Sequence, residues 1–346
     1  GEVTYDLTDS LTVAASMRHF DAESYLDGFS GTVWWPCGGG PSAAAQEASG
    51  VYRPTNNYGA DCADANRITA SKDEVYRVTA EWQATDDVMI YTAWGEGYRP
   101  GGLNRFCSVG NEADYGGQGR DDATGAGCDF VPDFLTSYEV GVKASLFDGR
   151  MVLNAAAFMQ EWDDFQFSRL DVAISPVTLT YNIGQATSDG FEADFSAMIS
   201  ENWSLTGGFS YIEAELSEDY YASDGLATPT AASGTTLPRV PDTKWNLSSR
   251  YSMDDGWYMQ TSYIYTGASY NNLFDGGSLP TKRYKQKDYQ ILNASVGLDK
   301  DTWRAELYIR NVTDERGEVF RNAVNWDDRI MTNRPRTLGA SMSLKF

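Results

Sequence analysis

The sequence predicts an all-β protein that forms a transmembrane antiparallel β-barrel, and three observations lead to this prediction. Apolar and polar residues alternate over many segments of about a dozen residues each. The segments are joined alternately by very short polar turns and by long loops, as in bacterial outer-membrane barrels with short periplasmic turns and long extracellular loops. Finally, the chain ends on an alternating segment whose last residue is aromatic, Phe346.

The last segment shows the alternation most clearly. One face carries Leu338, Ala340, Met342, Leu344 and Phe346, and the other carries Thr337, Gly339, Ser341, Ser343 and Lys345. An apolar face opposite a small polar face suits a strand with lipid on one side and a water-filled lumen on the other. We therefore expect residues 334–346 to form a strand of a membrane wall.

Four other segments alternate as clearly: 76–83, 138–146, 191–199 and 303–310. Their charged residues lie almost entirely on one face. In segments 88–94 and 151–162 the lipid-facing side is not evident from the sequence. A soluble β-sandwich would also alternate, but it has no reason to restrict every second connection to a tight turn or to use such long strands.

Thirteen strands are predicted in chain order. They are 1–7, 10–22, 71–84, 88–98, 134–147, 151–168, 178–199, 203–217, 240–253, 257–270, 286–298, 302–313 and 334–346. The short turns are 8–10, 85–87, 148–150, 200–202, 254–256 and 299–301, and the long loops are 23–70, 99–132, 169–177, 218–238, 271–285 and 314–333. Because bacterial single-chain barrels have even strand numbers, an odd count that starts in mid-strand leads us to expect further strands before residue 1.

Composition excludes several classes. The mean hydropathy is −0.44 and no apolar run approaches 18 residues, which excludes a helical membrane protein. The net charge is −22, from 27 basic and 49 acidic residues, and this argues against a nucleic-acid partner. Of the 346 residues 13% are aromatic, with 21 Tyr, 10 Trp and 33 Gly, a mixture that suits strands, interfacial girdles and turns.

The four cysteines are Cys37, Cys62, Cys107 and Cys128, and they fall as two close pairs within predicted extracellular loops. Four cysteines allow three pairings, of which two local disulfides, Cys37 with Cys62 and Cys107 with Cys128, are the simplest. Such bonds imply an oxidising exterior. With no closer cysteine spacing and His19 as the only histidine, we predict no metal site and no resident cofactor.

Enzymatic function is not indicated. The sequence contains no Gly-X-Ser-X-Gly elbow, no P-loop and no His-Glu-X-X-His motif. His19 lies near no evident nucleophile in the sequence. The acidic loop runs lack the spacing of a calcium loop and are interpreted as solvated charge.

Several motifs resemble those of TonB-dependent outer-membrane receptors. In Tyr91–Asn104 an aromatic strand runs into Arg99-Pro-Gly-Gly-Leu-Asn104, which is similar to the family's basic-X-Gly-Gly-aliphatic-Asn turn. The segments Ser137–Lys143, Gly190–Glu192, Asn311–Asp314 and Pro335–Phe346 also resemble recurrent strand motifs of the family. Their order and spacing match over nearly the whole chain.

The resemblance implies a 22-stranded barrel with an amino-terminal plug in its lumen. Residues 1–346 would then be the carboxy-terminal part of the barrel, with its last thirteen strands, and the plug and first strands would lie outside this sequence. The location implied is the bacterial outer membrane, in contact with lipid and lipopolysaccharide. The activity implied is active import, driven by TonB with ExbB and ExbD acting through the plug.

Loop residues that combine aromatic rings with charge are the predicted substrate contacts. The first loop offers Trp34, Trp35, Tyr52, Arg53 and Tyr58; the second offers Tyr98, Arg99, Asn104, Arg105 and Phe106; the last offers Trp326, Asp327, Asp328 and Arg329. For any single residue, a place in the interfacial girdle or a solvated loop charge is the alternative.

The predicted function is import of a scarce nutrient, with a ferric siderophore as the default cargo because most of the family handles iron complexes. An oligosaccharide or another organic nutrient is the alternative cargo. A barrel that serves as a scaffold in a surface assembly, and a passive porin-like barrel, are alternatives of other classes. Haem is disfavoured because one histidine cannot supply the usual axial ligands.

Overall fold

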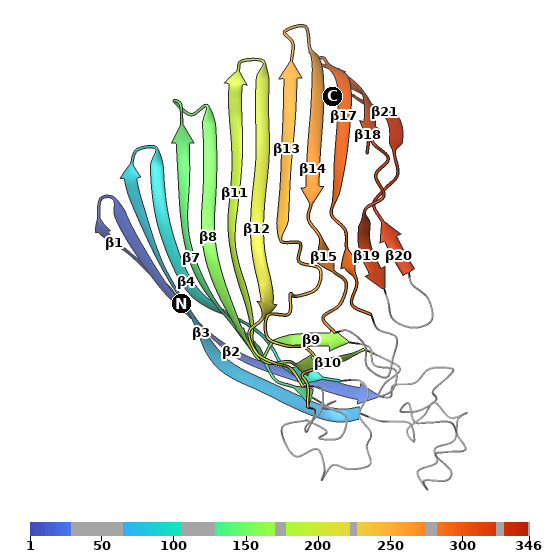
Figure 1. The fold of residues 1–346 in the computed structure, drawn as a ribbon. Coiled ribbons are helices and arrows are strands. Elements are labelled where there is room, and N and C mark those ends of the chain that lie inside the picture. Colours follow the sequence, from blue (N-terminus) through green and yellow to red (C-terminus); the bar gives the residue numbers. More distant parts are fainter. Residues whose placement is uncertain are drawn as a thin grey trace.

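The computed structural model describes residues 1–28, 65–104, 129–169, 178–221, 227–274, 282–322 and 329–344. Their long strands form a single thirteen-stranded antiparallel sheet in which sequence neighbours are also spatial neighbours (Figure 1). The sheet is open and strongly curved, with β1 at one edge and β21 at the other. The predicted number and order of strands are therefore confirmed.

The strands of the sheet alternate in direction along its whole width. They are β1 (Glu2–Thr8), β2 (Leu11–Gly28), β3 (Ala65–Thr85), β4 (Val88–Arg99), β7 (Asp133–Leu146), β8 (Met151–Asp163), β11 (Ala186–Ser200), β12 (Trp203–Leu216), β13 (Thr243–Ser252), β14 (Trp257–Thr266), β17 (Tyr289–Asp299), β18 (Trp303–Arg310) and β21 (Thr337–Leu344). We call the edge of the sheet with the short turns the turn end, and the opposite edge the loop end.

The loop end carries short hairpins that the sequence did not predict. They are β5 (Gly102–Leu103) with β6 (Asp129–Phe130), β9 (Gln166–Arg169) with β10 (Leu179–Asn182), β15 (Ser269–Tyr270) with β16 (Lys285–Gln286), and β19 (Glu318–Asn322) with β20 (Arg329–Thr332). Predicted strands 151–168, 178–199, 257–270 and 286–298 are each divided as a result. Between β8 and β9 the chain turns at Asp164, whose φ is 53°, and between β10 and β11 it turns at Gly184, whose φ is 86°. The strands β9 and β10 then lie across the long strands (Figure 1).

Two neighbouring rows of residues across the sheet show how the faces differ. Each row follows the residues that pair in register from β2 or β3 to β14. One row is entirely apolar: Leu11, Trp82, Ile90, Val142, Ala155, Ala193, Phe209, Trp245 and Tyr265. The next row is largely polar: Glu81, Tyr91, Gly141, Ala156, Glu192, Ser210, Lys244 and Thr266. The alternation predicted for single strands is therefore continuous across the sheet.

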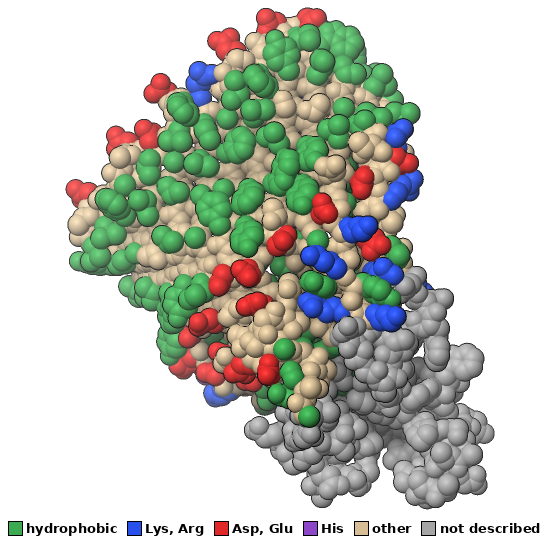
Figure 2. Space-filling view, in the orientation of Figure 1, with side chains coloured by type: hydrophobic (Ala, Val, Ile, Leu, Met, Phe, Trp, Pro, Cys, Tyr) green, Lys and Arg blue, Asp and Glu red, His purple; other side chains and the backbone are tan. Residues whose placement is uncertain are grey.

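The apolar face is the outer, convex one. Hydrophobic side chains cover this face over the long strands, whereas charged side chains gather near both ends of the sheet (Figure 2). Among its exposed residues are Trp82, Val140 and Met259. The two segments without an evident lipid side are now assigned, because Ile90 of β4 and Ala155 of β8 lie in the apolar row.

Aromatic rings on the inner face lie over glycines of the next strand. The ring of Tyr91 covers Gly141, and the ring of Tyr258 covers Gly297, so closely that a Cβ at either glycine would collide with the ring. The two hydroxyls reach beyond the glycines and donate to Glu139 and Glu306, in each case at 2.6 Å. Ring and glycine together fix the register between neighbouring strands.

A hydrophobic core lies at the loop end of the sheet. It joins the hairpin β9–β10 to the ends of β11 and β12 and to the loops that follow β12 and β15. Its most buried members include Leu179, Ile183 and Leu216. This core packs the loop-end segments against one another beside β11 and β12. Among the described residues, no helix is long and apolar enough to cross a membrane.

Candidate transport wall and loop-end site

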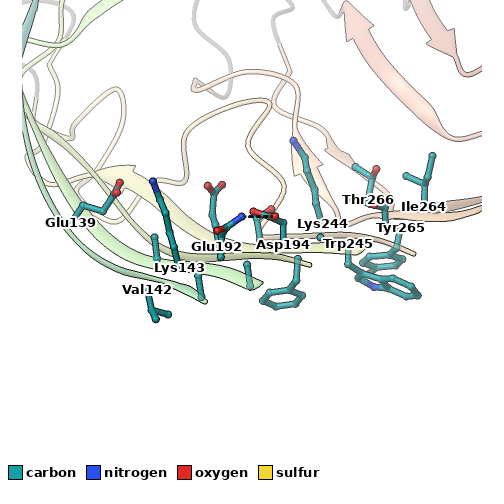
Figure 3. Close-up of a pocket in the computed structure, with 18 of the residues that line it drawn as sticks. Glu139, Val142, Lys143, Glu192, Asp194, Lys244, Trp245, Ile264, Tyr265 and Thr266 are labelled. Atoms are coloured by element: carbon teal, nitrogen blue, oxygen red, sulfur yellow. Dashed lines mark hydrogen bonds between the residues drawn. The ribbon is translucent and has the colours of Figure 1, made fainter. Parts of the chain in front are cut away.

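The inner face carries a cavity of about 550 Å³ that is lined from β4 to β14. Glu139, Lys143, Glu192 and Lys244 point into it, while Trp245 and the other ring-bearing outer residues point the opposite way (Figure 3). The cavity is thus a hollow in the curved inner wall. Residues of the polar row and of the adjacent rows line it, on the side of the sheet that would face a barrel lumen.

Charges of both signs lie along this inner wall. Glu139 and Lys143 come from β7, Glu192 and Asp194 from β11, and Lys244 from β13. The amide of Asn154 donates to a carboxylate oxygen of Asp194 at 3.0 Å. Such a wall can hold water or a polar protein surface and would be costly against lipid. Within the described ranges, no group of three or more His, Cys, Asp or Glu residues could hold a metal ion.

Arg99, a predicted substrate contact, is part of an ion pair at the loop end. Its Nε donates to both oxygens of Asp133 at 3.0 and 2.9 Å, and its Nη2 donates to Asp133 and to the carbonyl oxygen of Gln166. The guanidinium also lies 4.8 Å from the ring centroid of Trp162. Asp133 is fully buried, whereas 45% of the Arg99 side chain is exposed. Arg99 therefore connects β4 to β7 and β9, and the rest of its side chain remains exposed to solvent.

Asn104, at the end of the same motif, pairs with the backbone of β10. Its amide nitrogen donates to the carbonyl oxygen of Thr180, and its amide oxygen accepts from the Thr180 N–H, both at 2.8 Å. Asn104 is only 5% exposed. The ring of Phe130 packs directly on Gly102, where a Cβ would collide with it. The Arg-Pro-Gly-Gly-Leu-Asn motif is thus a brace between the second loop and the hairpin β9–β10.

The remaining predicted contacts divide into placed and unplaced residues. Tyr98 stacks on Phe20 with ring centroids 3.4 Å apart, and Arg18 approaches the same ring. Arg329 is exposed at the start of β20, paired with Asn322. Outside the described residues lie Trp34, Trp35, Tyr52, Arg53, Tyr58, Arg105, Phe106, Trp326, Asp327, Asp328 and the four cysteines.

The Asn311–Asp314 motif forms a second brace at the loop end. Asn311 is 2% exposed, and its amide donates to the carbonyl oxygens of Glu315 and Arg334, both at 2.9 Å. Asp314 accepts the backbone N–H of Arg336 at 2.8 Å. This hydrogen bond and the nearby Arg316 hold the pKa of the Asp314 carboxyl below its usual value. The motif therefore connects the end of β18 to the start of β21.

Sequence reasoning missed Asp133, Gln166 and Asn271. Asn271 is 7% exposed; its amide oxygen accepts from Tyr284 N–H and its amide nitrogen donates to the carbonyl oxygen of Lys282. Asp133 and Gln166 are the first residues of β7 and β9, and Asn271 directly follows β15. A polar residue at the end of a strand is ordinarily solvated, so the sequence carries no sign that these three bind distant partners.

The comparison with protein families decides the identity of the fold. Residues 1–312 match the family model described as TonB dependent receptor-like, beta-barrel. The chain belongs to this family. Its location is accordingly the bacterial outer membrane, and the family is one of receptors.

Curated relatives cover most of this chain. The probable TonB-dependent siderophore receptor PiuA of Acinetobacter baumannii is 23% identical over 70% of this chain and 30% of its own length. The metal-pseudopaline receptor CntO of Pseudomonas aeruginosa is 28% identical over 78% of this chain and 33% of its own length. The matched part of the chain thus covers about a third of the length of these relatives.

Solved structures show the same fold. The ferric yersiniabactin uptake receptor FyuA from Yersinia pestis is similar over 100% of this chain and 44% of its own, with a TM-score of 0.71 and 19% identity. The ferric-catecholate import receptor Fiu from Escherichia coli K12 is similar over 98% of this chain and 43% of its own, with a TM-score of 0.68 and 19% identity. The open, curved sheet therefore corresponds to part of a TonB-dependent receptor barrel.

Proposed function

We propose that the complete protein imports a ferric siderophore across the outer membrane, and that this chain forms part of the wall and mouth of its channel. The observation that carries the proposal is the pair of neighbouring rows, one apolar toward lipid and one charged toward the lumen. A wall of this kind needs a wide polar interior, which side chains alone do not fill. PiuA, which this chain resembles, is named as a probable siderophore receptor, and FyuA, whose fold it shares, is named as a ferric yersiniabactin uptake receptor.

The chain would be the carboxy-terminal part of a 22-stranded barrel. Both edges of the sheet, β1 and β21, are unpaired within the described residues, and an open edge is not tolerated in a bilayer. Further strands between β21 and β1, and a plug in the lumen, would complete the structure. The intact mass of the polypeptide under reducing, denaturing conditions tests this: we expect about twice the 38.2 kDa of this chain, and a mass of 38.2 kDa would contradict it.

The proposed partners follow from this arrangement. TonB, energised by ExbB and ExbD, would pull on the plug, and lipopolysaccharide would surround the outer face. The charged inner wall at Glu139, Lys143 and Glu192 would bind the polar surface of the plug. No chemical step on the cargo is proposed, since transport requires only binding and release.

We also propose that the loop residues predicted from the sequence contact the cargo. Tyr98, Arg99 and Arg329 are placed at the loop end, where an external ligand would arrive. Asn104 is assigned a supporting role, because both ends of its amide are bonded to Thr180. For the loop cysteines we propose the pairs Cys37–Cys62 and Cys107–Cys128, which peptide mapping without reduction would identify.

Uptake of radioactive iron tests the function. The full-length protein is expressed in cells that lack their own siderophore receptors, with and without a functional tonB gene, and supplied with iron-55 complexes of a catecholate, a hydroxamate and a carboxylate siderophore. We expect accumulation of at least one complex, and only in cells with TonB. Equal uptake without TonB would favour a passive barrel. No uptake of any iron complex, with uptake of an oligosaccharide, would favour the alternative cargo.

A further inference from the structure

A second cavity, of about 390 Å³, lies beside the first one toward the loop end. It is enclosed by the segment before β13, the end of β14, and the strands β16, β17 and β19. Lys244 and Thr266 line both cavities, and Lys244 points to the inner side of the sheet (Figure 3). The second cavity therefore opens toward the lumen, between the mouth of the barrel and its charged inner wall.

Three cations line this second cavity: Arg239, Lys244 and Lys287. All three are exposed. Within the described part of the chain, none of their side chains forms an ion pair or a hydrogen bond, although Arg239 lies over the ring of Phe320 at 4.7 Å. Several unpaired cations around one cavity attract an anion more strongly than any one of them would alone.

Two of the three acids around this cavity are engaged by other residues. Glu318, the acid in its lining, lies 3.9 Å from Arg321. Asp288 accepts the hydroxyl of Tyr265 at 3.4 Å, and Tyr265 points to the outer side (Figure 3). Asp242 places a carboxylate oxygen against Gly267, a lining residue, and so offsets part of the positive charge of the three cations. The lining itself thus keeps an excess of positive charge in a chain whose net charge is −22.

The basic character continues beyond the cavity. Residues 282–287 read Lys-Arg-Tyr-Lys-Gln-Lys, with four cations in six positions. Arg283 and Lys285 lie 3.7 and 6.0 Å from the ring centroid of Tyr270. Both cations therefore lie over the Tyr270 ring, a cation–π contact that favours their place beside the cavity. In Figure 2, which shows the outer face, Lys and Arg side chains also gather near β15 and β19.

We propose that this second cavity is an anion-binding site that receives the carboxylate, phenolate or phosphate groups of a ligand on its way into the lumen. The inference rests on the proposed function for its cargo, and it adds that the cargo is anionic and that Lys244 and Lys287 select for this charge. Lys244 also lines the inner-wall cavity. The same ammonium group could therefore contact the anion in the second cavity and again as the anion enters the inner-wall cavity.

Inorganic pyrophosphate is a suitable probe because it carries the charge without a siderophore. Its binding to the full-length receptor in detergent is measured by calorimetry for the wild type, for K244Q/K287Q, and for the control K72Q/K300Q. The control removes the same charge at Lys72, which pairs with Asp21 at 3.5 Å, and at Lys300 in a turn. A fourth protein, K244R/K287R, keeps the charge at the site.

We expect saturable binding that is about tenfold weaker in K244Q/K287Q, equal to the wild type in the control, and within about twofold of it in K244R/K287R. Binding should also weaken as salt is raised. Equal binding by all four proteins, equal weakening in the control, or no saturable binding to the wild type would each overturn the site.

The two proposals can fail separately. Iron uptake that requires TonB, together with no effect of K244Q/K287Q on pyrophosphate binding, would leave the importer and remove the anion site. Pyrophosphate binding that depends on these two lysines, in a protein that imports no iron complex, would leave the site and remove the siderophore as its ligand.

Discussion

The wall and the loop end of this sheet are stabilised in different ways. In the wall, each residue pairs in register with its neighbours across up to thirteen strands, and every second side chain faces lipid. At the loop end, short hairpins are fixed by single polar side chains, such as Asp133, Asn104 and Asn311, and by a small hydrophobic core. Stability is thus distributed in the wall and concentrated in a few residues at the loop end.

This difference bears on function. Many equivalent backbone hydrogen bonds stabilise the wall, so a single substitution should change its stability little. In addition, lipid fills the space left by a removed outer side chain. The loop end surrounds the place where a ligand would enter, and its braces set the positions of Arg99 and the hairpin β9–β10. Substitutions there should therefore have larger effects on both stability and binding.

The largest effect is expected for Leu179→Ala in the loop-end core. Leu179 is fully buried, so truncation leaves a cavity and should lower the free energy of unfolding by about 3 kcal/mol. Leu307→Ala is the matched control, because Leu307 is 63% exposed on the outer face and lipid can fill its space; about 1 kcal/mol is expected there. Urea unfolding in lipid vesicles measures both. Equal losses would mean that wall and loop end do not differ in this respect.

The next effect concerns the buried carboxylate. Asp133→Asn removes the charge that Arg99 contacts and should cost about 2 kcal/mol, a value reduced from that of a fully buried pair because Arg99 is half-exposed. Amide exchange in β9 should rise as well, since Gln166 N–H donates to Asp133 at 3.0 Å. Asp21→Asn, in a surface pair with Lys72, is the control and should change neither quantity. Unchanged exchange in β9 would show that Asp133 does not brace the hairpin.

Within the wall, the glycine beneath Tyr258 offers a comparable test. Gly297→Ala should cost about 1 to 2 kcal/mol, because the added Cβ displaces the ring and breaks the hydrogen bond to Glu306. In a Tyr258→Ala background the same change should cost close to nothing, since no ring remains to be displaced. Additive costs in the double variant would indicate that the glycine is needed for some other reason.

Asn104→Asp should have a smaller effect, of about 1 kcal/mol. The carboxylate can still accept the Thr180 N–H but cannot donate to the Thr180 carbonyl oxygen. Hydrogen exchange in β10 should report the loss before global unfolding does. Asn154→Asp serves as a control from the wall, where the amide bonds only one side-chain oxygen, that of Asp194, and exchange in β10 should be unaffected.

The smallest effect concerns pH. The pKa of Asp314 is lowered from 3.8 by the Arg336 N–H and by Arg316, so its carboxylate stabilises the folded state above pH 3.8 and loses this contribution as the pH falls through the lower, folded-state pKa. Asp314→Asn should therefore be slightly less stable than wild type near neutral pH, and the difference should shrink below pH 3.8. A difference that grows on acidification would have the wrong sign.

The wall could be predicted from the sequence almost strand by strand. The period of two in segments such as 138–146 is a local property, and the same period sets which face meets lipid. The faces of 88–94 and 151–162 needed the structure. In these strands, apolar residues such as Val152 and Phe158 also occur on the inner face, so only the register with neighbouring strands decides the orientation.

The loop end could be predicted only in part. The motifs at 99–104 and 311–314 were singled out through resemblance, but their role as braces depends on partners far away in the chain, Thr180 for Asn104 and Arg334 for Asn311. Such pairs have no period and no local propensity. Arg99 was expected to contact a ligand, and the pattern gave no indication that Asp133, 34 residues further on, pairs with it.

The central claim is that alternate residues of these strands face lipid and lumen, and neighbouring labels at positions 142 and 143 test it most directly. Spin labels are introduced through an unnatural amino acid, so that the native cysteines are untouched, in the full-length receptor in lipid vesicles. Val142 and Lys143 point to opposite sides of the sheet (Figure 3). We predict frequent collisions with dissolved oxygen, which concentrates in lipid, for the label at 142 and rare ones for the label at 143. Equal or reversed collision rates would contradict the account.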